Sequence, residues 1–235
     1  LKLLSGEVFH IKNRKILEYM NEREKITASI IDEGLIAIVR VNHPDLTLPI
    51  AKALVSGGIR AIELTMTIPN ALDAIRTIDR ELGNEILLGV GTVIDDDTCK
   101  AAIDAGAKYV ISPITKTSLV ESAHAMNRPV MLGAYTPTEA QTAHEAGSDF
   151  IKIFPADALG PNYIKALLAP LKHLRIIPTG GVNLDTMESF LAAGSAALGI
   201  GSSLLKNNII KSKKWSDLEL LSKQHVDKLS KIKTI

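Results

Sequence analysis

This 235-residue chain has little of what a disulfide scaffold or a nucleic-acid-binding protein needs. Cys99 is its single cysteine, which excludes an intrachain disulfide and a cysteine-based metal cage. The 27 Lys and Arg residues nearly balance the 26 Asp and Glu residues, so the formal net charge is +1. No excess of positive charge is left to attract nucleic acid or an acidic membrane surface, and we expect neither as a partner.

Long apolar runs are also missing from the sequence. No stretch approaches the roughly 20 apolar residues that a membrane-spanning helix requires. The segment Leu1–Met20 mixes charged with apolar side chains and contains no apolar core of a secretory signal. The unpaired Cys99 fits a reducing compartment. These features predict a cytoplasmic protein.

The composition that remains is typical of one globular domain, with 46% hydrophobic and 23% charged residues. Short β-branched or aliphatic runs alternate with stretches whose apolar residues lie three and four apart, as at Leu48, Ala51, Leu54 and Val55. The runs expected to be strands are Leu35–Val41, Ala61–Met66, Ile86–Gly91, Tyr109–Ser112, Pro129–Gly133, Phe150–Phe154, Arg175–Pro178 and Ala196–Ile200.

Strict alternation of strands and helices implies a parallel sheet with right-handed crossovers. Gly58, Gly106, Gly147 and Gly194 precede four of the runs, and we expect each to end a helix in the left-handed conformation. Eight units in a domain of this length predict an α/β fold of the (β/α)8 TIM-barrel type. A doubly wound open sheet is the alternative. The regular spacing and the lack of a Gly-x-Gly-x-x-Gly turn after the first run disfavour it.

The segments outside the eight units predict two further helices. Residues before Leu35 are expected to form an extra N-terminal helix that closes the bottom of the barrel. The segment Trp215–Ser230 is expected to form a C-terminal helix.

Three charged residues interrupt the apolar runs: Arg40, Glu63 and Lys152. Both faces of a barrel strand are covered, so a charge there is costly unless it is paired or used. Alternation places Lys152 on the same face as Phe150 and Phe154. All three charges lie toward the C-terminal ends of their runs, where the active sites of this fold are found.

A lysine in this setting suggests Schiff-base chemistry. Burial disfavours the charged form of an amine, and a neutral amine can attack a ketone to form an iminium ion that draws electrons from a nearby carbon–carbon bond. Glu63 is the strand carboxylate available to move the protons of that reaction. The alternative is a buried ion pair between Lys152 and Glu63 that only holds the barrel together. Three convergent charges at the catalytic end favour chemistry over that alternative.

A second pattern indicates a phosphate site. The seventh run leads into Thr179, Gly180 and Gly181, and the eighth leads into Gly201–Ser203. Glycines let backbone N–H groups approach an anion, and Ser202 or Ser203 is expected to begin a helix whose N-terminus favours negative charge. Loops after the seventh and eighth strands are the usual phosphate site of this barrel.

We expect no metal ion. Asp95–Asp97 follows the third run and is interpreted as the acidic start of a helix. The six histidines show no spacing of the His-x-x-x-His kind. His124 and His144 are expected on helix faces, as packing or solvent-facing residues, whereas His43 lies near the mouth with a minor substrate role left open.

With these features the sequence resembles the 2-keto-3-deoxy-6-phosphogluconate (KDPG) and 4-hydroxy-2-oxoglutarate (KHG) aldolase family. The resemblance runs from about Met20 to Leu205, so we expect an extension over residues 1–19 and one barrel domain over residues 20–235. Its most specific segments are Ile62–Thr65, Gly89–Val93, Ile111–Pro113, Thr136–Glu139, Phe150–Ala156 and Pro178–Val182.

The resemblance implies a class I aldolase that uses no metal or other cofactor and assembles as a homotrimer. It implies that Lys152 forms the Schiff base and that Glu63 transfers protons. The residues assigned to the substrate carboxylate or another anion are Arg40, Thr92 and Pro113. The residues assigned to the phosphate are Thr179, Gly180, Gly181, Gly201 and Ser202.

The sequence departs from the family at two positions. Some members carry an arginine four residues after the glutamate, where it grips the carboxylate, and this chain has Thr67 there. After Ser112 and Pro113 the family often has glycine, histidine or asparagine, and this chain has Ile114. Both differences bear on which keto acid is preferred.

The expected reaction is reversible cleavage of KDPG to pyruvate and glyceraldehyde 3-phosphate, with KHG, cleaved to pyruvate and glyoxylate, as a further substrate. One alternative is an aldolase for the galactonate epimer. Another is a phosphate-binding barrel isomerase or epimerase, which would not need a lysine on the sixth strand. A barrel kept only for assembly or ligand sensing is disfavoured, because it would have no use for the charges at the mouth.

Overall fold

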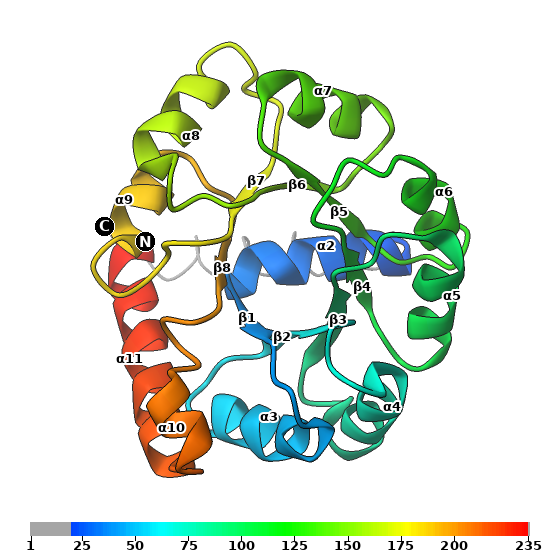
Figure 1. Ribbon diagram of the computed structural model, residues 1–235. Coiled ribbons are helices and arrows are strands. Elements are labelled where there is room, and N and C mark those ends of the chain that lie inside the picture. Colours follow the sequence, from blue (N-terminus) through cyan, green and yellow to red (C-terminus); the bar gives the residue numbers. More distant parts are fainter. Residues whose placement is uncertain (1–19, 235) are drawn as a thin grey trace, which may run out of the picture.

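The computed structural model describes residues 20–234, in which a ring of eight parallel strands is surrounded by helices (Figure 1). The strands are β1 Leu35–Val39, β2 Ala61–Thr65, β3 Leu87–Gly91, β4 Tyr109–Ile111, β5 Val130–Ala134, β6 Phe150–Ile153, β7 Ile176–Pro178 and β8 Leu198–Ile200. Each strand up to β7 pairs with the next, and β8 pairs with β1. A parallel bridge between Thr179 and Gly199 joins β7 to β8. The predicted (β/α)8 barrel is confirmed.

The helices of the repeating units lie outside the strands (Figure 1). They are α3 Thr47–Ser56, α4 Ala71–Leu82, α5 Asp96–Asp104, α6 Ser118–His124, α7 Pro137–Glu145, α8 Gly160–Leu168 and α9 Met187–Ala192, with the short helices η1 Pro44–Leu46 and α10 Asn207–Lys211 in addition. Gly58, Gly106, Gly147 and Gly194 have φ values between 94° and 119°. The prediction that a left-handed glycine ends each of these helices is therefore confirmed.

An additional helix, α2 (Glu22–Glu33), lies across the N-terminal end of the ring (Figure 1). Asn21 caps it, and Glu24 completes a capping box. Its Ile26 and Ile30 are buried against the residues that fill the lower barrel. The prediction of an extra N-terminal helix that closes the bottom of the barrel is therefore confirmed.

The C-terminal helix α11 runs from Trp215 to Lys233, three residues beyond the predicted end. It packs along α3, which places the end of the chain beside the first strand–helix unit. The Lys233 ammonium donates hydrogen bonds to the Ile31 and Asp32 carbonyls at the end of α2. These hydrogen bonds join α11 to α2. A lysine is stabilising there, because it satisfies unpaired carbonyls at the C-terminus of a helix.

Alternation along the strands divides the core into two parts. The larger part lies between the strands and the outer helices. The smaller part fills the inside of the ring and contains Ile36, Ala61, Tyr109, Phe150 and Ile177. Apolar side chains and α2 therefore close the lower half of the ring, so a ligand can enter only from the C-terminal ends of the strands.

Strand β1 is shorter than predicted. Its pairing with β2 ends at Val39 and Leu64, whereas the sequence suggested a strand to Val41. Arg40 follows the strand and is exposed, so the expectation that its charge lies inside a covered strand is wrong. Glu63 in β2 and Lys152 in β6 are buried within their strands, as predicted.

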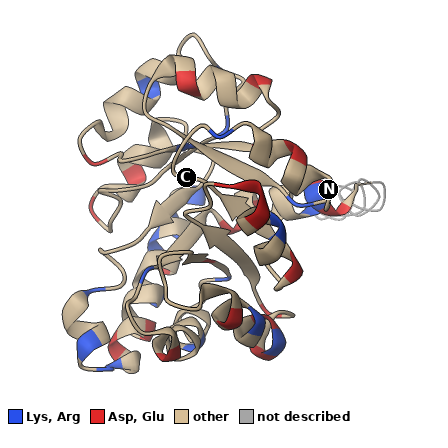
Figure 2. Ribbon diagram, turned by 45° about the vertical axis from the view of Figure 1, so that its right-hand side comes forward, with Lys and Arg blue, Asp and Glu red and all other residues tan. Residues whose placement is uncertain are grey.

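Acidic and basic residues are interspersed over the outer helices (Figure 2). Over residues 20–234 no helix is long and apolar enough to cross a membrane. The predicted extension, residues 1–19, lies outside the described residues.

Candidate active site

Lys152 and Glu63 meet inside the barrel. Lys152 faces inward from β6, and Glu63 faces inward from β2. The Lys152 Nζ atom lies 4.0 Å from Glu63 Oε1, and only 5% of the lysine and 1% of the glutamate is exposed. The sequence predicted charges that converge at the catalytic end of the barrel, and the structure brings these two together. The distance leaves room for a reacting group to contact both.

Two inward-facing glycines make space around this pair. A Cβ atom on Gly91 of β3 would overlap the carboxylate of Glu63. A Cβ on Gly133, the neighbour of Lys152 in the β5–β6 register, would overlap the backbone carbonyl of Pro113. Glycine is therefore required at both positions, because any side chain would displace a group of the candidate site.

Burial raises the pKa of the Glu63 carboxyl group, and the positive charges of Lys152 and Arg40 offset part of this effect. Neither carboxylate oxygen has a hydrogen-bond partner within residues 20–234. A carboxyl group with a raised pKa can exchange protons near neutral pH, which is the property that a general acid–base needs.

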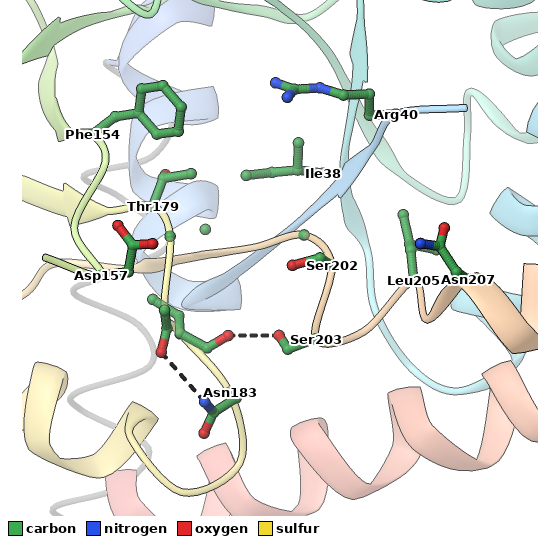
Figure 3. A pocket seen from close by; sticks show the side chains of 15 residues that line it. Ile38, Arg40, Phe154, Asp157, Thr179, Asn183, Ser202, Ser203, Leu205 and Asn207 are labelled. Carbon is green, nitrogen blue, oxygen red and sulfur yellow. Dashed lines mark hydrogen bonds between the residues drawn. The ribbon is translucent and has the colours of Figure 1, made fainter. Parts of the chain in front are cut away.

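A cavity of about 560 Å³ opens at the C-terminal ends of β1, β7 and β8 (Figure 3). Lys152 and Glu63 are not among the residues that line it, but Phe154, which follows Lys152 and β6, is. Arg40 and Phe154 line its upper part, where the guanidinium extends toward the aromatic ring (Figure 3). The Lys152 ammonium lies 5.1 Å from the centre of the Phe154 ring. Arg40 is thus placed to meet an anionic group of a ligand that reaches Lys152.

The opposite wall of the cavity consists of the two glycine-containing turns. Gly180 and Gly181 have φ values of 101° and 70°, which are accessible mainly to glycine. The backbone N–H groups of Gly181, Ser202 and Ser203 donate no hydrogen bond to another group of residues 20–234. Thr179, which is buried, and Gly201 line the same wall. Free amides in such a concave turn are typical of an anion site.

One part of the phosphate prediction is wrong. Neither Ser202 nor Ser203 begins a helix, because the chain first makes a single turn in which Leu204 and Leu205 both donate to the Gly201 carbonyl. The next helix, α10, begins at Asn207. The Ser203 hydroxyl donates to the Val182 carbonyl and so ties the two turns together (Figure 3). The amides of the turn, rather than a helix dipole, form this wall.

Thr92 directly follows β3 and has a φ of 62°, a conformation that a β-branched residue rarely adopts. Such strain is found mainly where the surrounding structure holds a residue in a functional position. Thr92 and Pro113 follow neighbouring strands at the open end of the ring, and both are half-buried. They are not among the residues that line the cavity beside Arg40.

Several cavity residues were not expected from the sequence. Asp157, Asn183 and Asn207 line the cavity, and Asp157 packs against the Gly180–Gly181 turn. Asp157 and Asn183 lie in loops without periodicity, and Asn207 begins the short helix α10, so the sequence pattern could not identify them. Phe154 could have been found, because it shares a strand face with Lys152.

Of the remaining candidates, Asp95 and His124 have structural roles. Asp95 caps α5 by accepting from the Thr98 N–H, which confirms the acidic start of this helix. The His124 Nε2 atom lies 2.9 Å from Asp149 Oδ2, near the N-terminal ends of the strands. His43 lines a second cavity next to Arg40 and remains an open candidate.

Comparison with known proteins agrees with this geometry. The sequence matches the family described as KDPG and KHG aldolase over residues 26–221. The 2-dehydro-3-deoxy-phosphogluconate aldolase of Pseudomonas aeruginosa is 30% identical over 216 residues, which cover 90% of this chain and 98% of that protein. The 2-dehydro-3-deoxy-6-phosphogalactonate aldolase of Escherichia coli is 35% identical over 173 residues, or 73% of this chain and 84% of that protein.

Solved structures show the same similarity. A structure described as native KDPGal matches with a TM-score of 0.79 at 31% identity and covers 86% of this chain and 96% of its own. A KDPG aldolase from Legionella pneumophila, with pyruvate captured as a covalent carbinolamine intermediate, matches with a TM-score of 0.78 at 28% identity, over 84% of this chain and 96% of its own. This chain belongs to the KDPG and KHG aldolase family.

Proposed function

We propose that this protein is a class I aldolase that reversibly cleaves KDPG to pyruvate and glyceraldehyde 3-phosphate. The observation that carries the proposal is the buried pair of Lys152 and Glu63, 4.0 Å apart. An amine and a carboxyl group at this distance supply both the nucleophile and the proton carrier of Schiff-base chemistry. Membership of the aldolase family supports the same reaction.

In the proposed reaction the neutral amine of Lys152 attacks the C2 carbonyl of the keto acid, and loss of water gives an iminium ion. Glu63 then accepts the proton of the C4 hydroxyl while the C3–C4 bond breaks. The electrons of that bond move into the iminium and leave an enamine, and glyceraldehyde 3-phosphate departs. Glu63 returns the proton to C3, and hydrolysis releases pyruvate and regenerates the amine.

The two ends of the substrate would be held by different groups at the open end of the barrel. Arg40, Thr92 and Pro113 are proposed to contact the carboxylate near Lys152. The turns at Thr179–Gly181 and Gly201–Ser202 are proposed to hold the phosphate through their free amides. This division is supported by the unpaired N–H groups of the turns.

Trapping with pyruvate and borohydride tests the proposal. Reduction should add one pyruvate-derived group to Lys152, and peptide mass spectrometry would locate it. Lys152→Ala should lose both the adduct and turnover, whereas Lys165→Ala, a change at an exposed lysine of α8, should retain them. Folded wild-type protein that forms no adduct would contradict the mechanism.

The role of Glu63 has a separate test. Glu63→Gln keeps the shape of the side chain but cannot carry the proton, so we expect kcat to fall about 100-fold or more with KM little changed. Steady-state kinetics of cleavage would measure this. An unchanged kcat would mean that another group moves the proton.

The galactonate epimer of KDPG is a second candidate substrate. The similarity to the phosphogalactonate aldolase of Escherichia coli, at 35% identity, supports it. Thr67 stands where some members carry an arginine, and Ile114 stands where the family often has glycine, histidine or asparagine, so these are the first positions to examine for substrate preference. Relative kcat/KM values for the two epimers and for unphosphorylated KHG would decide among the three.

An isomerase or epimerase of sugar phosphates would use the phosphate turns without Lys152. Activity on a sugar phosphate that survives Lys152→Ala would favour it. We also propose a homotrimer, on the strength of the family resemblance, and a cytoplasmic location remains a prediction. One barrel domain over residues 20–235, preceded by an extension, is the proposed organisation.

A further inference from the structure

Another buried polar side chain, that of Tyr109, lies close to Lys152 and Glu63, and the proposed reaction does not use it. Tyr109 is the first residue of β4, faces the inside of the ring and is 0% exposed. In the strand register Tyr109 pairs with Gly89 of β3, and Gly89 pairs with Glu63 of β2. Tyr109 and Glu63 therefore belong to one row of the barrel wall with only a glycine between them.

Gly89 lets the tyrosine ring cross β3. A Cβ atom on Gly89 would overlap Cε2 and Cζ of Tyr109, so the far end of the ring lies directly over this glycine. The ring thus extends from β4 over β3, the strand that separates Tyr109 from Glu63 on β2. The negative charge of Glu63 adds to burial in raising the pKa of Tyr109, which fits two groups that are near each other.

Three polar atoms in this row have no protein partner. The Tyr109 hydroxyl and both carboxylate oxygens of Glu63 are buried and form no hydrogen bond within residues 20–234. Buried polar atoms are costly when unsatisfied, and phenylalanine would fill the same space without a hydroxyl. A water molecule enclosed with two to four polar partners is the usual way in which such atoms are satisfied.

We propose that Tyr109 positions the Glu63 carboxylate through one enclosed water, to which the tyrosine hydroxyl donates and which in turn donates to Glu63. Tyr109 is thus a positioning residue and does not contact the substrate. The kinetic part of this inference rests on the proposed aldolase function, and the spectroscopic part does not.

The expected consequence concerns the pH dependence of Glu63. Charged and titratable groups reach Glu63 from three directions: Lys152 on β6, Arg40 after β1 and Tyr109 on β4, while β3 contributes only Gly89 and Gly91. A hydrogen bond donated to a carboxylate favours its ionised form. Loss of the hydroxyl should therefore raise the pH at which Glu63 ionises.

Tyr109→Phe tests the inference, because it removes only the hydroxyl. We expect the acid limb of the kcat profile to move up by about 0.5–1 pH unit, which lowers kcat on that limb about three- to tenfold with KM unchanged. The melting temperature should not rise. Tyr163→Phe is the matched control, because its hydroxyl donates to the Tyr135 carbonyl on the outside of the barrel. Its profile should match the wild type.

Two outcomes would overturn the inference. One is a profile of Tyr109→Phe that superimposes on the wild type while the melting temperature rises, which would mean that the hydroxyl is simply unsatisfied. The other is a failure of 3-fluorotyrosine at position 109 to move the limb in the opposite direction. Fluorination makes the hydroxyl a stronger donor, so the limb should move to lower pH.

Infrared spectroscopy gives a readout without substrate. The carbonyl band of protonated Glu63, identified by its loss in Glu63→Gln, should persist to higher pH in Tyr109→Phe than in the wild type. A band that titrates identically in both proteins would contradict the role of Tyr109. Failure of the wild type in the pyruvate trap, together with a shifted band in Tyr109→Phe, would instead contradict the aldolase function alone.

Discussion

At the scale of single residues, Glu63 combines a stability cost with a chemical use. The residue is buried, and its carboxyl group lacks a direct hydrogen bond within residues 20–234. Desolvation is the largest influence on its pKa and raises it, while Lys152 and Arg40 act against this rise. The ionised form is therefore destabilising in the folded protein, and the same burial prepares the group for proton transfer.

Replacing Glu63 by glutamine should stabilise the protein in a pH-dependent manner. Below the pKa of an unfolded glutamate the group is protonated in both states, so the two proteins should differ little. As the pH rises toward the raised folded pKa, the wild type alone loses stability, by about 1.4 kcal/mol for each pH unit that separates the unfolded pKa from the folded one. Denaturant titrations across the pH range would measure the difference in the free energy of unfolding.

Glu139 provides the control of opposite sign. Hydrogen bonds from Tyr135 and Thr136 lower its pKa, so its ionised form stabilises the start of α7. Glu139→Gln should therefore lose stability at neutral pH, and the loss should disappear as the pH falls through the lowered pKa. A gain for Glu139→Gln, or a loss for Glu63→Gln at neutral pH, would contradict these opposite roles.

Cys99 should be inert in the folded protein. It is fully buried in α5, and burial raises the pKa of its thiol to about 11. Since the thiolate is the reactive form, iodoacetamide at pH 8 should leave native Cys99 unmodified and alkylate it after denaturation. Mass spectrometry of the intact chain would measure the extent. Rapid native modification would show that α5 opens locally.

At the scale of elements, the turn after β7 is the one proposed to hold the substrate phosphate. Gly181 and Gly160 both have a left-handed backbone, with φ values of 70° and 67°. A Cβ on Gly181 would approach the Asp157 Cα to 2.8 Å, whereas a Cβ on Gly160 would meet nothing within 4 Å. Comparison of substitutions at Gly181 and Gly160 therefore separates the effect of backbone strain from the effect of a distorted turn.

Both Gly181→Ala and Gly160→Ala should destabilise the protein by about 1–2 kcal/mol, because alanine disfavours the left-handed conformation. Only Gly181→Ala should also raise KM for a phosphorylated substrate, since it distorts the turn whose amides are proposed to hold the phosphate. Kinetics with phosphorylated KDPG and unphosphorylated KHG would show the difference. Equal KM effects in the two variants would argue against a phosphate site at this turn.

The elements also show the limits of the sequence patterns. The alternation rule identified β2 and β6 and placed Glu63 and Lys152 on their inner faces. It succeeded because successive side chains of a strand point to opposite faces of the sheet. The end of β1 was misplaced by two residues, because pairing with β2, rather than residue type, ends the strand. The helix expected at Ser202 failed for a similar reason, since a local turn satisfies the Gly201 carbonyl first.

At the scale of the whole molecule, the barrel is closed at one end and open at the other. α2 covers the N-terminal ends of the strands, and the cavity opens at their C-terminal ends. A shortened chain that begins at Met20 should therefore retain the melting temperature and the activity of the full chain, because the proposed barrel domain starts there. Calorimetry and kinetics of the two proteins would test this organisation, and a large loss of stability would contradict it.

The proposed homotrimer predicts a particle with three times the mass of one chain. Light scattering coupled to gel filtration would measure this mass over a range of concentrations. A mass equal to that of one chain throughout would contradict the proposal.

The sequence by itself determined the class of fold, the buried lysine and glutamate, and the two glycine-containing turns. These follow from periodicity and from residue types that tolerate few environments, which are local properties of the chain. Only the tertiary structure decided the distance between Lys152 and Glu63, the exposed position of Arg40 and the place of Asp157 against the Gly180–Gly181 turn. It also placed the ring of Tyr109 over Gly89, because contacts across strands depend on register and closure, which no single segment encodes.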